Sequence, residues 1–410
     1  MPEDGKPVYM RLNKFETAVV VKIDKSYAKY VRDNGTMVVQ LKRALYGCVE
    51  SARMWYDKLS SDLEAIGYVR NKHDMCVFNR IEANGKQSTL LLHVDDIFMS
   101  ADSEETIDKI IADIGSMYKS LQINRGRVLD YLGMTFDFTT DGTCKVTMDG
   151  YINDLLECCE HITGVAQTPA GNDLFTVKED SAVLDTADKE FFHSLTAKLL
   201  YLGKRVRPDI LTAISYLTKR VLCPNNDDMK KLHRVIRYIR GTRTMGINLS
   251  ANQQLAVLGY VDASYGVHSD MKSHTGTVIG IGRGPIFCKS ATQKINTKSS
   301  TEAELVGLSD SAGQFLWARY FLEEQGYSMG PAKIYQDNMS TISMVKNGKS
   351  SSDRTRHIAI RFFFVADRVN SKEIEIEYMK TGEMLADLLT KPLQGNLFRR
   401  LRDQLLNWNS

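Results

Sequence analysis

The sequence predicts a chain of mixed α/β (α+β) class, with strands and helices at both ends and a helical part between them. Strand-like alternation of apolar and polar residues recurs in residues 8–42 and 75–94, whereas residues 189–241 have helical spacing. From about residue 254, three strand-like runs precede a helix and two further strand–helix pairs. This order is typical of a compact domain in which helices cover a mixed sheet.

The N-terminal part contains three apolar runs within residues 8–42 that predict strands, namely VYMRL, AVVVKID and TMVVQL. Residues 51–67 predict a helix, because apolar residues recur there at helical spacing and Gly67 stands at the end. A second amphipathic helix is expected over 103–118. The runs YLGMTFDF and CKVTM that follow predict two strands joined by a tight Asp-Gly turn.

Two adjacent aspartates interrupt the apolar run LLLHVDDIFMSA, residues 90–101. Strands are expected over 75–80 and 87–94, and another apolar run, IFMSA, follows the acids. Asp95 and Asp96 therefore lie at the tip of the β-hairpin that the strand 87–94 forms with this run. An exposed tip is the reasonable place for such a pair, because burying two uncompensated carboxylates would be costly. Both a solvated turn and a metal-binding pair fit this placement.

A polar stretch over 163–188 predicts a linker before the helical region 189–241, which is expected to break at Pro208 and Pro224. Lys and Arg are dense over 198–243, with few acids between them. Such a run forms either a surface that binds the nucleic-acid backbone or ordinary solvated helix faces.

Four acids in the C-terminal part share apolar surroundings and a position at the edge of the predicted sheet. They are Asp262 in the first strand, Glu304 early in the long helix over 300–325, Asp337 after the fourth strand, and Asp387 on the final helix. Converging carboxylates repel one another unless a divalent cation neutralises them. A pair of Mg²⁺ ions held in this way can activate a water and stabilise the departing oxygen of a phosphodiester.

Each acid also has a purely structural interpretation. Asp337 could be only a helix N-cap, Glu304 a first-turn acid favoured by the helix dipole, and Asp387 a solvated acid. Asp262 fits such a role least, because strand-like apolar residues flank it. Glu302 competes with Glu304, but residues two apart lie about 200° around a helix. Only one of them can therefore join a shared site.

The composition is that of an ordinary globular protein, with 410 residues and a net charge of +3. The 7 cysteines form no CxxC pair, which predicts reduced thiols and neither a disulfide framework nor a zinc module. No signal-peptide pattern occurs, and no apolar stretch approaches the roughly 18 residues of a membrane span. We therefore expect an intracellular protein of the cytoplasm or nucleus, without a membrane partner.

The C-terminal part resembles the ribonuclease H domain of copia-type retrotransposon polyproteins. The resemblance covers nearly all of residues 255–395, through the segments YVDASY, SSTEAEL, YQDN, RTRHIAIRFFF and EMLADLLTKPL. It implies cleavage of the RNA strand of an RNA/DNA hybrid, and it favours the second acid of the TEAE run over the first. It also implies that Mg²⁺ or Mn²⁺ is held by Asp262, Glu304, Asp337 and Asp387. His357, in RTRHI, would either help to release product or be a hydrogen-bonded structural histidine.

The N-terminal half is similar to the later part of the reverse transcriptase of the same polyproteins. The similarity rests on VYMRL, LKRALYGCVESARMWYDKL, the two-aspartate hairpin, YLGMTF and YINDLLE. It implies that Asp95 and Asp96 bind the metal ions of a polymerase and that Gly47 lies near the nascent base pair. Arg53 and Lys58 would touch phosphates or be solvated. The family's first catalytic aspartate precedes VYM, where this chain has only MPEDGKP, so the polymerase site is expected to be incomplete.

Together these resemblances predict four parts along the chain. They are a partial polymerase palm over 1–165, a helical thumb or connection over 166–250, a ribonuclease H-like domain over 251–395 and a C-terminal tail over 396–410. The leading interpretation is a metal-dependent ribonuclease H with nucleic acid as its partner. The alternative is a non-catalytic nucleic-acid-binding remnant or domesticated protein. An integrase fits badly, because no zinc-binding His/Cys module precedes the acids.

Overall fold

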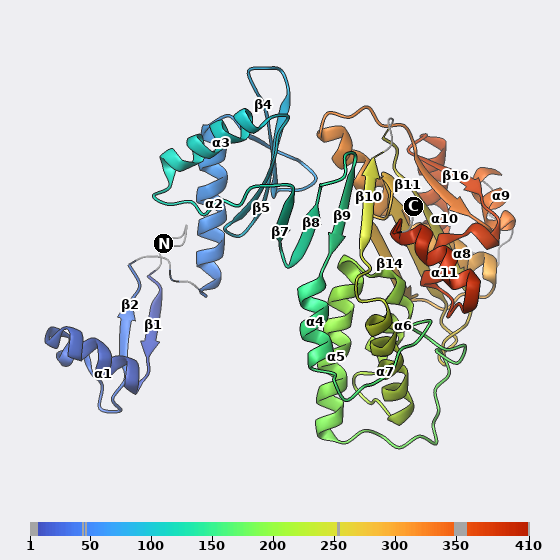
Figure 1. Ribbon diagram of the computed structural model, residues 1–410, viewed down its shortest axis with the longest axis horizontal. Coiled ribbons are helices and arrows are strands. Elements are labelled where there is room, and N and C mark those ends of the chain that lie inside the picture. Colours follow the sequence, from blue (N-terminus) through green and yellow to red (C-terminus); the bar gives the residue numbers. More distant parts are fainter. Residues whose placement is uncertain (1–6, 43–44, 46, 252–254, 348–358, 409–410) are drawn as a thin grey trace. The chain divides into compact units, whose positions relative to one another are not determined.

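The protein, seen in a computed structural model, has the mixed α/β class that the sequence predicts (Figure 1). The structure describes residues 7–42, 45, 47–251, 255–347 and 359–408. The chain forms two compact units, Met1–Gln122 and Ile123–Ser410. Among the described helices, none is both long and apolar enough to cross a membrane.

The first unit contains a two-stranded sheet, β1-β2, and a four-stranded sheet in the order β3-β4-β5-β6. Its elements are β1 (Tyr9–Leu12), α1 (Lys14–Ile23), the 3₁₀ helix η1 (Lys25–Tyr30), β2 (Met37–Gln40), α2 (Val49–Ala65), β3 (Val69–Arg70), β4 (Val77–Ile81), β5 (Gln87–His93), β6 (Asp96–Ser100) and α3 (Glu104–Met117). Helices α2 and α3 share a core with the four-stranded sheet, through Leu63, Phe78, Leu90 and Ile110.

The expectation of a strand at AVVVKID is wrong, because this run lies in helix α1. Asn13 and Glu16 form a capping box. The Asn13 side chain accepts from the Glu16 N–H at 2.9 Å, and a Glu16 carboxylate oxygen accepts from the Asn13 N–H at 2.7 Å. This cap satisfies backbone donors at the helix start and outweighs the strand preference of the valines.

The second unit begins with a sheet in the order β13-β10-β9-β8-β7 and a bundle formed by α5, α6 and α7 (Figure 1). The elements up to residue 251 are β7 (Val128–Tyr131), β8 (Met134–Asp137), β9 (Thr143–Thr147), α4 (Asp149–Glu157), α5 (Thr186–Arg205), η2 (Pro208–Ile210), α6 (Leu211–Arg220), α7 (Asn226–Gly241) and β10 (Ile247–Ala251). The helical region breaks near Pro208 and Pro224, as predicted.

The rest of this unit is built on a five-stranded sheet in the order β14-β12-β11-β15-β16. Its elements are β11 (Leu258–Ser264), β12 (His274–Gly280), β13 (Gly282–Arg283), β14 (Phe287–Thr292), α8 (Ser300–Glu324), β15 (Ala332–Gln336), α9 (Met339–Asn347), α10 (Ala359–Asn370), β16 (Ile374–Tyr378), η4 (Thr381–Glu383), η5 (Leu385–Leu389) and α11 (Gly395–Leu406). The first three long strands are antiparallel, whereas β15 runs parallel to both β11 and β16. The predicted mixed sheet is therefore present.

Two C-terminal features differ from the sequence expectations. A single final helix carrying Asp387 was expected, but the structure has two separate elements there. Asp387 lies on the 3₁₀ turn η5, and α11 begins only at Gly395. The segment expected as a tail contains most of α11, whose Phe398 and Leu401 are buried in one core with Tyr238 of α7. The compact units divide at 122/123, and β9 of the second unit pairs with β10.

Candidate metal centre

Three carboxylates from different elements meet at the end of the five-stranded sheet. Asp262 comes from β11, Glu304 from α8, and Asp337 directly follows β15. One ligand oxygen from each lies within 4.8 Å of the others, and Asp262 and Glu304 are only 2% and 5% exposed. Among the described residues, this is the only group of three or more His, Cys, Asp or Glu side chains so placed.

Neighbouring residues take the two roles at helix starts, an N-cap and a first-turn acid, that could have explained Asp337 and Glu304. At the start of α9, the Asn338 side chain accepts from the Thr341 N–H at 3.0 Å, so Asp337 is not the cap. At the start of α8, the Glu302 side chain accepts from the Lys298 N–H at 2.7 Å. Glu304 is therefore the acid of this pair that the helix brings to Asp262.

Polar side chains hold each member of the three-carboxylate group. The Thr390 hydroxyl donates to Asp262, and the Thr381 hydroxyl donates to Asp337 at 2.8 Å. Gln336 is fully buried, and its amide nitrogen donates to Glu304 at 3.2 Å. The amide oxygen of Gln336 accepts from the Asp337 N–H at 2.8 Å. These contacts fix the carboxylates before any ligand arrives.

The fourth predicted acid, Asp387, lies beside the group and is paired with a lysine. Asp387 is 3% exposed. The Lys391 ammonium lies 2.6 Å from an Asp387 oxygen and 3.5 Å from an Asp262 oxygen. Thr390 and Lys391 were both absent from the sequence prediction. The signal was present, because Lys391 stands four residues after Asp387, a spacing that brings side chains together on one turn.

The buried acids hold their protons more tightly than exposed ones. Burial raises the pKa of Asp262, and Lys391 offsets this only in part. Burial and then the charge of Asp262 raise the pKa of Glu304 well above its usual range. The same two causes raise the pKa of Asp387 to about 7. Burial by itself would lower the pKa of Lys391, but Asp262 and Asp387 more than compensate and raise it.

The donor set suits a hard divalent cation. Carboxylate oxygens are the ligands that Mg²⁺ and Mn²⁺ prefer, and this group offers neither a thiol nor an imidazole. A cation at this position would favour the deprotonated acids and so relieve the repulsion that raises their pKa values. Asp262, Glu304 and Asp337 therefore fit a magnesium or manganese site, with Asp387 next to it.

Gly276 allows the segment that carries Asp387 to lie against the sheet. This glycine pairs with Asp262 across β12 and β11. A Cβ atom at Gly276 would come within 2.7 Å of the Ala386 carbonyl oxygen and 2.8 Å of both the Leu389 Cβ and a Thr390 methyl carbon. No ordinary Cβ tolerates such distances, so any side chain here must push η5 outward.

Gly276→Ala is expected to lower the free energy of unfolding by about 1–3 kcal/mol, the usual cost of overpacking. It should also weaken divalent-metal binding, because η5 carries Asp387 and leads into Thr390. Urea denaturation and metal titration measure the two effects. Gly313→Ala on α8 is the matched control, since nothing lies within 4 Å of its added Cβ. The control should stabilise the protein slightly, and an equal response of both variants would contradict the steric argument.

Asp95 and Asp96 lie on the predicted hairpin, which the structure contains as β5 and β6. Both are exposed, and Asp96 pairs with His93 where the strands meet. The turn is anchored by Trp55, whose indole N–H donates to the Val94 carbonyl at 2.8 Å. Within the described part of the chain, no third acid joins them in a group of the kind found at Asp262.

The other residues that the resemblance implicated have local contacts or lie outside the described residues. Arg53 pairs with Asp57 at 2.7 Å, and Lys58 pairs with Asp62 at 2.6 Å, each within α2. Gly47 adopts a positive φ of 92°. His357 lies outside the described residues.

Part of the basic run over 198–243 is occupied within the protein. Four basic side chains of α7 donate to backbone carbonyls of the preceding segment, 159–176. They are Lys231 to Thr176, Arg234 to Thr168, Arg237 to Thr163, and Arg240 to Cys159 and Ile162. These residues satisfy a long connection that has little backbone pairing of its own. These four side chains therefore form neither a solvated helix face nor a free phosphate-binding surface.

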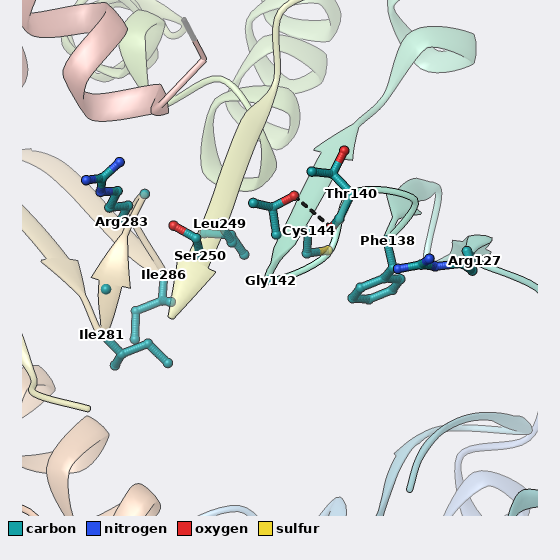
Figure 2. A pocket seen from close by; sticks show the side chains of 13 residues that line it. Arg127, Phe138, Thr140, Gly142, Cys144, Leu249, Ser250, Ile281, Arg283 and Ile286 are labelled. Atoms are coloured by element: carbon teal, nitrogen blue, oxygen red, sulfur yellow. Dashed lines mark hydrogen bonds between the residues drawn. The ribbon is translucent and has the colours of Figure 1, made fainter. Parts of the chain in front are cut away.

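A separate pocket of about 410 Å³ lies between the β8–β9 turn, β10 and β13 (Figure 2). Leu249, Ile281 and Ile286 contribute to its apolar lining, while Arg127 and Arg283 stand on opposite sides. Burial raises the pKa of the lining residue Cys144 to about 11, which keeps its thiol protonated. The lining has no carboxylate or imidazole, so this pocket is not a second cation site.

The chain is similar to reverse transcriptases and transposon polyproteins. Residues 14–169 match the family model "Reverse transcriptase (RNA-dependent DNA polymerase)". The retrovirus-related Pol polyprotein from transposon RE1 of Arabidopsis thaliana is 28% identical over 91% of this chain and 25% of its own length. The polyprotein from transposon TNT 1-94 of Nicotiana tabacum is 26% identical over 90% of this chain and 28% of its own length. The chain thus spans about a quarter of these relatives.

Solved structures also show similarity at low sequence identity. A ribonuclease H1 isolated from compost by a metagenomic approach matches 33% of this chain and 91% of its own, with 12% identity and a TM-score of 0.25. The prototype foamy virus protease-reverse transcriptase matches 87% of this chain and 41% of its own, with 12% identity and a TM-score of 0.24.

Proposed function

We propose that this chain, which belongs to the copia-type retrotransposon Pol polyproteins, hydrolyses the RNA strand of RNA/DNA hybrids at its acidic C-terminal site. The observation that carries the proposal is the meeting of Asp262, Glu304 and Asp337 within 4.8 Å at the end of one sheet. Metal-dependent phosphodiester hydrolysis uses such a concentration of carboxylates to hold its cations.

Mg²⁺ or Mn²⁺ bound there would supply an activated water and stabilise the departing oxygen. The chain's own residues prepare the site. Asp262 belongs to the three-carboxylate group and also contacts Lys391, so it links this group to the Asp387–Lys391 pair. Gln336 holds the Glu304 carboxylate and the backbone of Asp337 with one amide. The ligands therefore need little rearrangement when the cation binds.

The experiment uses the full chain and a hybrid whose RNA strand is end-labelled. Cleavage is expected with Mg²⁺ or Mn²⁺, and none is expected with chelator or with a DNA duplex of the same sequence. An uncut hybrid in the presence of both metals would contradict the proposal. If the hybrid were bound but remained uncut, the chain would instead be a non-catalytic nucleic-acid-binding protein.

We also propose that Asp95 and Asp96 are the metal pair of the polymerase site. Their exposed position at a hairpin tip, within the reverse transcriptase match, supports this role. We expect little primer extension by this chain on an RNA template, since the described residues bring no third acid to the pair. Robust extension would show that another acid completes the site.

A further inference from the structure

The Lys391 ammonium lies between two acids, and only one of them is part of the three-carboxylate group. It contacts Asp387 at 2.6 Å and Asp262 at 3.5 Å. Asp262 belongs to the group, whereas Asp387 does not. The positive charge of Lys391 therefore stands on the side of Asp262 that faces Asp387.

Three acids around a central Asp262 define two places for a cation. The first is enclosed by Asp262, Glu304 and Asp337, whose ligand oxygens lie within 4.8 Å of one another. The second would have to lie between Asp262 and Asp387, because Asp387 is the remaining acid. The Lys391 ammonium lies between these two carboxylates.

We propose that Lys391 is an internal cation that holds the second position, so that a divalent ion enters there only when the ammonium withdraws. The inference rests on the proposed metal site, and it assigns Lys391 a positioning role and not a catalytic one. The lysine compensates two buried acids while the second ion is absent. It also makes the affinities for the two ions unequal, since only the second ion must displace an existing charge.

The surroundings of Lys391 allow the ammonium to leave. Its side chain is 34% exposed, whereas those of Asp262 and Asp387 are 2% and 5% exposed. The preceding residue, Thr390, is fully buried and donates its hydroxyl to Asp262. The backbone is thus anchored next to the acids, while the flexible lysine stem reaches toward solvent.

Mn²⁺ binding to the full chain without nucleic acid tests the inference, with free Mn²⁺ followed by electron paramagnetic resonance. The wild type should bind one ion tightly and a second at least about tenfold more weakly. Lys391→Met should raise the affinity for the second ion by about tenfold or more and leave the affinity for the first nearly unchanged. Lys391→Arg, which keeps the charge, should resemble the wild type.

Lys333→Met is the matched control, because it removes an equal charge from β15, where Lys333 pairs with Glu377. It should bind both ions as the wild type does. If Lys391→Met bound the second ion no more tightly than this control, the inference would be overturned. The experiment contains no hybrid, so failure of RNA cleavage would contradict the proposed function without touching this result.

Removing Lys391 could also prevent folding, because two buried acids would lose their cation. In that case Mn²⁺ should restore the folded state of Lys391→Met, as followed by circular dichroism. The double variant Asp387→Asn/Lys391→Met, which loses both charges, should fold without metal and bind one ion. If Mn²⁺ failed to restore the single variant while the double variant folded, the inference would be wrong.

Discussion

Replacing Glu304 by glutamine should reduce cleavage of an RNA/DNA hybrid by at least about 100-fold, the scale expected for loss of one preorganised electrostatic contact. Glu304 is 5% exposed, and its carboxylate oxygen lies within 4.8 Å of ligand oxygens from Asp262 and Asp337. Glutamine keeps the size of the side chain but removes the charge that a divalent cation requires. Initial rates with a labelled hybrid at saturating Mg²⁺ measure the effect.

Glu302→Gln provides a matched control for this prediction. Glu302 is buried to the same extent and lies two residues away, but its carboxylate accepts from the Lys298 N–H at the start of α8. The control should retain cleavage and lose at most about 1 kcal/mol of stability, the usual value of a helix cap. An equal loss of cleavage in both variants, with unchanged thermal unfolding, would place the essential acid elsewhere.

The elements that the sequence predicts well are those with local signals. Helix α7 begins at a capping box formed by Asn225 and Asp228 and ends at Gly241, and Pro208 and Pro224 mark the breaks on either side of α6. Periodicity, caps and prolines act over a few residues, so they can be recognised without knowledge of the tertiary structure. The same holds for the hairpin that carries Asp95 and Asp96.

The fold was predicted wrongly where a competing local signal or a distant contact determines the structure. In α1, the capping box of Asn13 and Glu16 overrides a strand-like run. At the C-terminus, Phe398 packs edge-on against Tyr238 at a ring distance of 5.7 Å. Nothing near Phe398 in the sequence indicates that partner, so the segment was expected as a tail.

In the candidate site, too, residues with a local sequence signal could be predicted, whereas residues whose role depends on distant contacts could not. The four acids were identifiable because a carboxylate in an apolar run is unusual. Glycine within a strand is a weaker signal, since it indicates only a bend or a close approach of another segment. That the approaching segment at Gly276 is η5 follows from the tertiary fold alone. For Lys391, the spacing of four residues from Asp387 was the available signal, but a lone lysine is ordinarily solvated, so the spacing was not used.

Arg207→Met should lower the free energy of unfolding by about 3–5 kcal/mol, as expected when one partner of a buried ion pair is removed. Arg207 and Asp209 side chains are both 0% exposed and form a bidentate pair with distances of 3.0 and 2.8 Å. Arg207 also donates to the Thr242 carbonyl at 2.9 Å. Without the guanidinium, the Tyr238 hydroxyl would be the only side-chain donor that the described residues offer to the Asp209 carboxylate. Urea denaturation measures the loss.

Two further variants distinguish the stability cost of an uncompensated buried charge from the cost of losing an arginine side chain. Arg127→Met removes a pair with Asp141 whose side chains are 58% and 94% exposed, and it should cost less than about 1 kcal/mol. Arg207→Met/Asp209→Asn should recover part of the loss, because it removes the uncompensated charge and keeps an acceptor for Tyr238. Similar costs for Arg207→Met and Arg127→Met would contradict the argument.

The Arg207 network also bears on the acidic site. Thr212, at the start of α6 just after Asp209, donates its hydroxyl to the Leu388 carbonyl in η5, next to Asp387. Arg207→Met should therefore weaken metal binding even below its unfolding temperature, whereas Arg127→Met should not. This difference would show that the helical part, although distant in sequence from the acids, helps to hold the fourth of them in place.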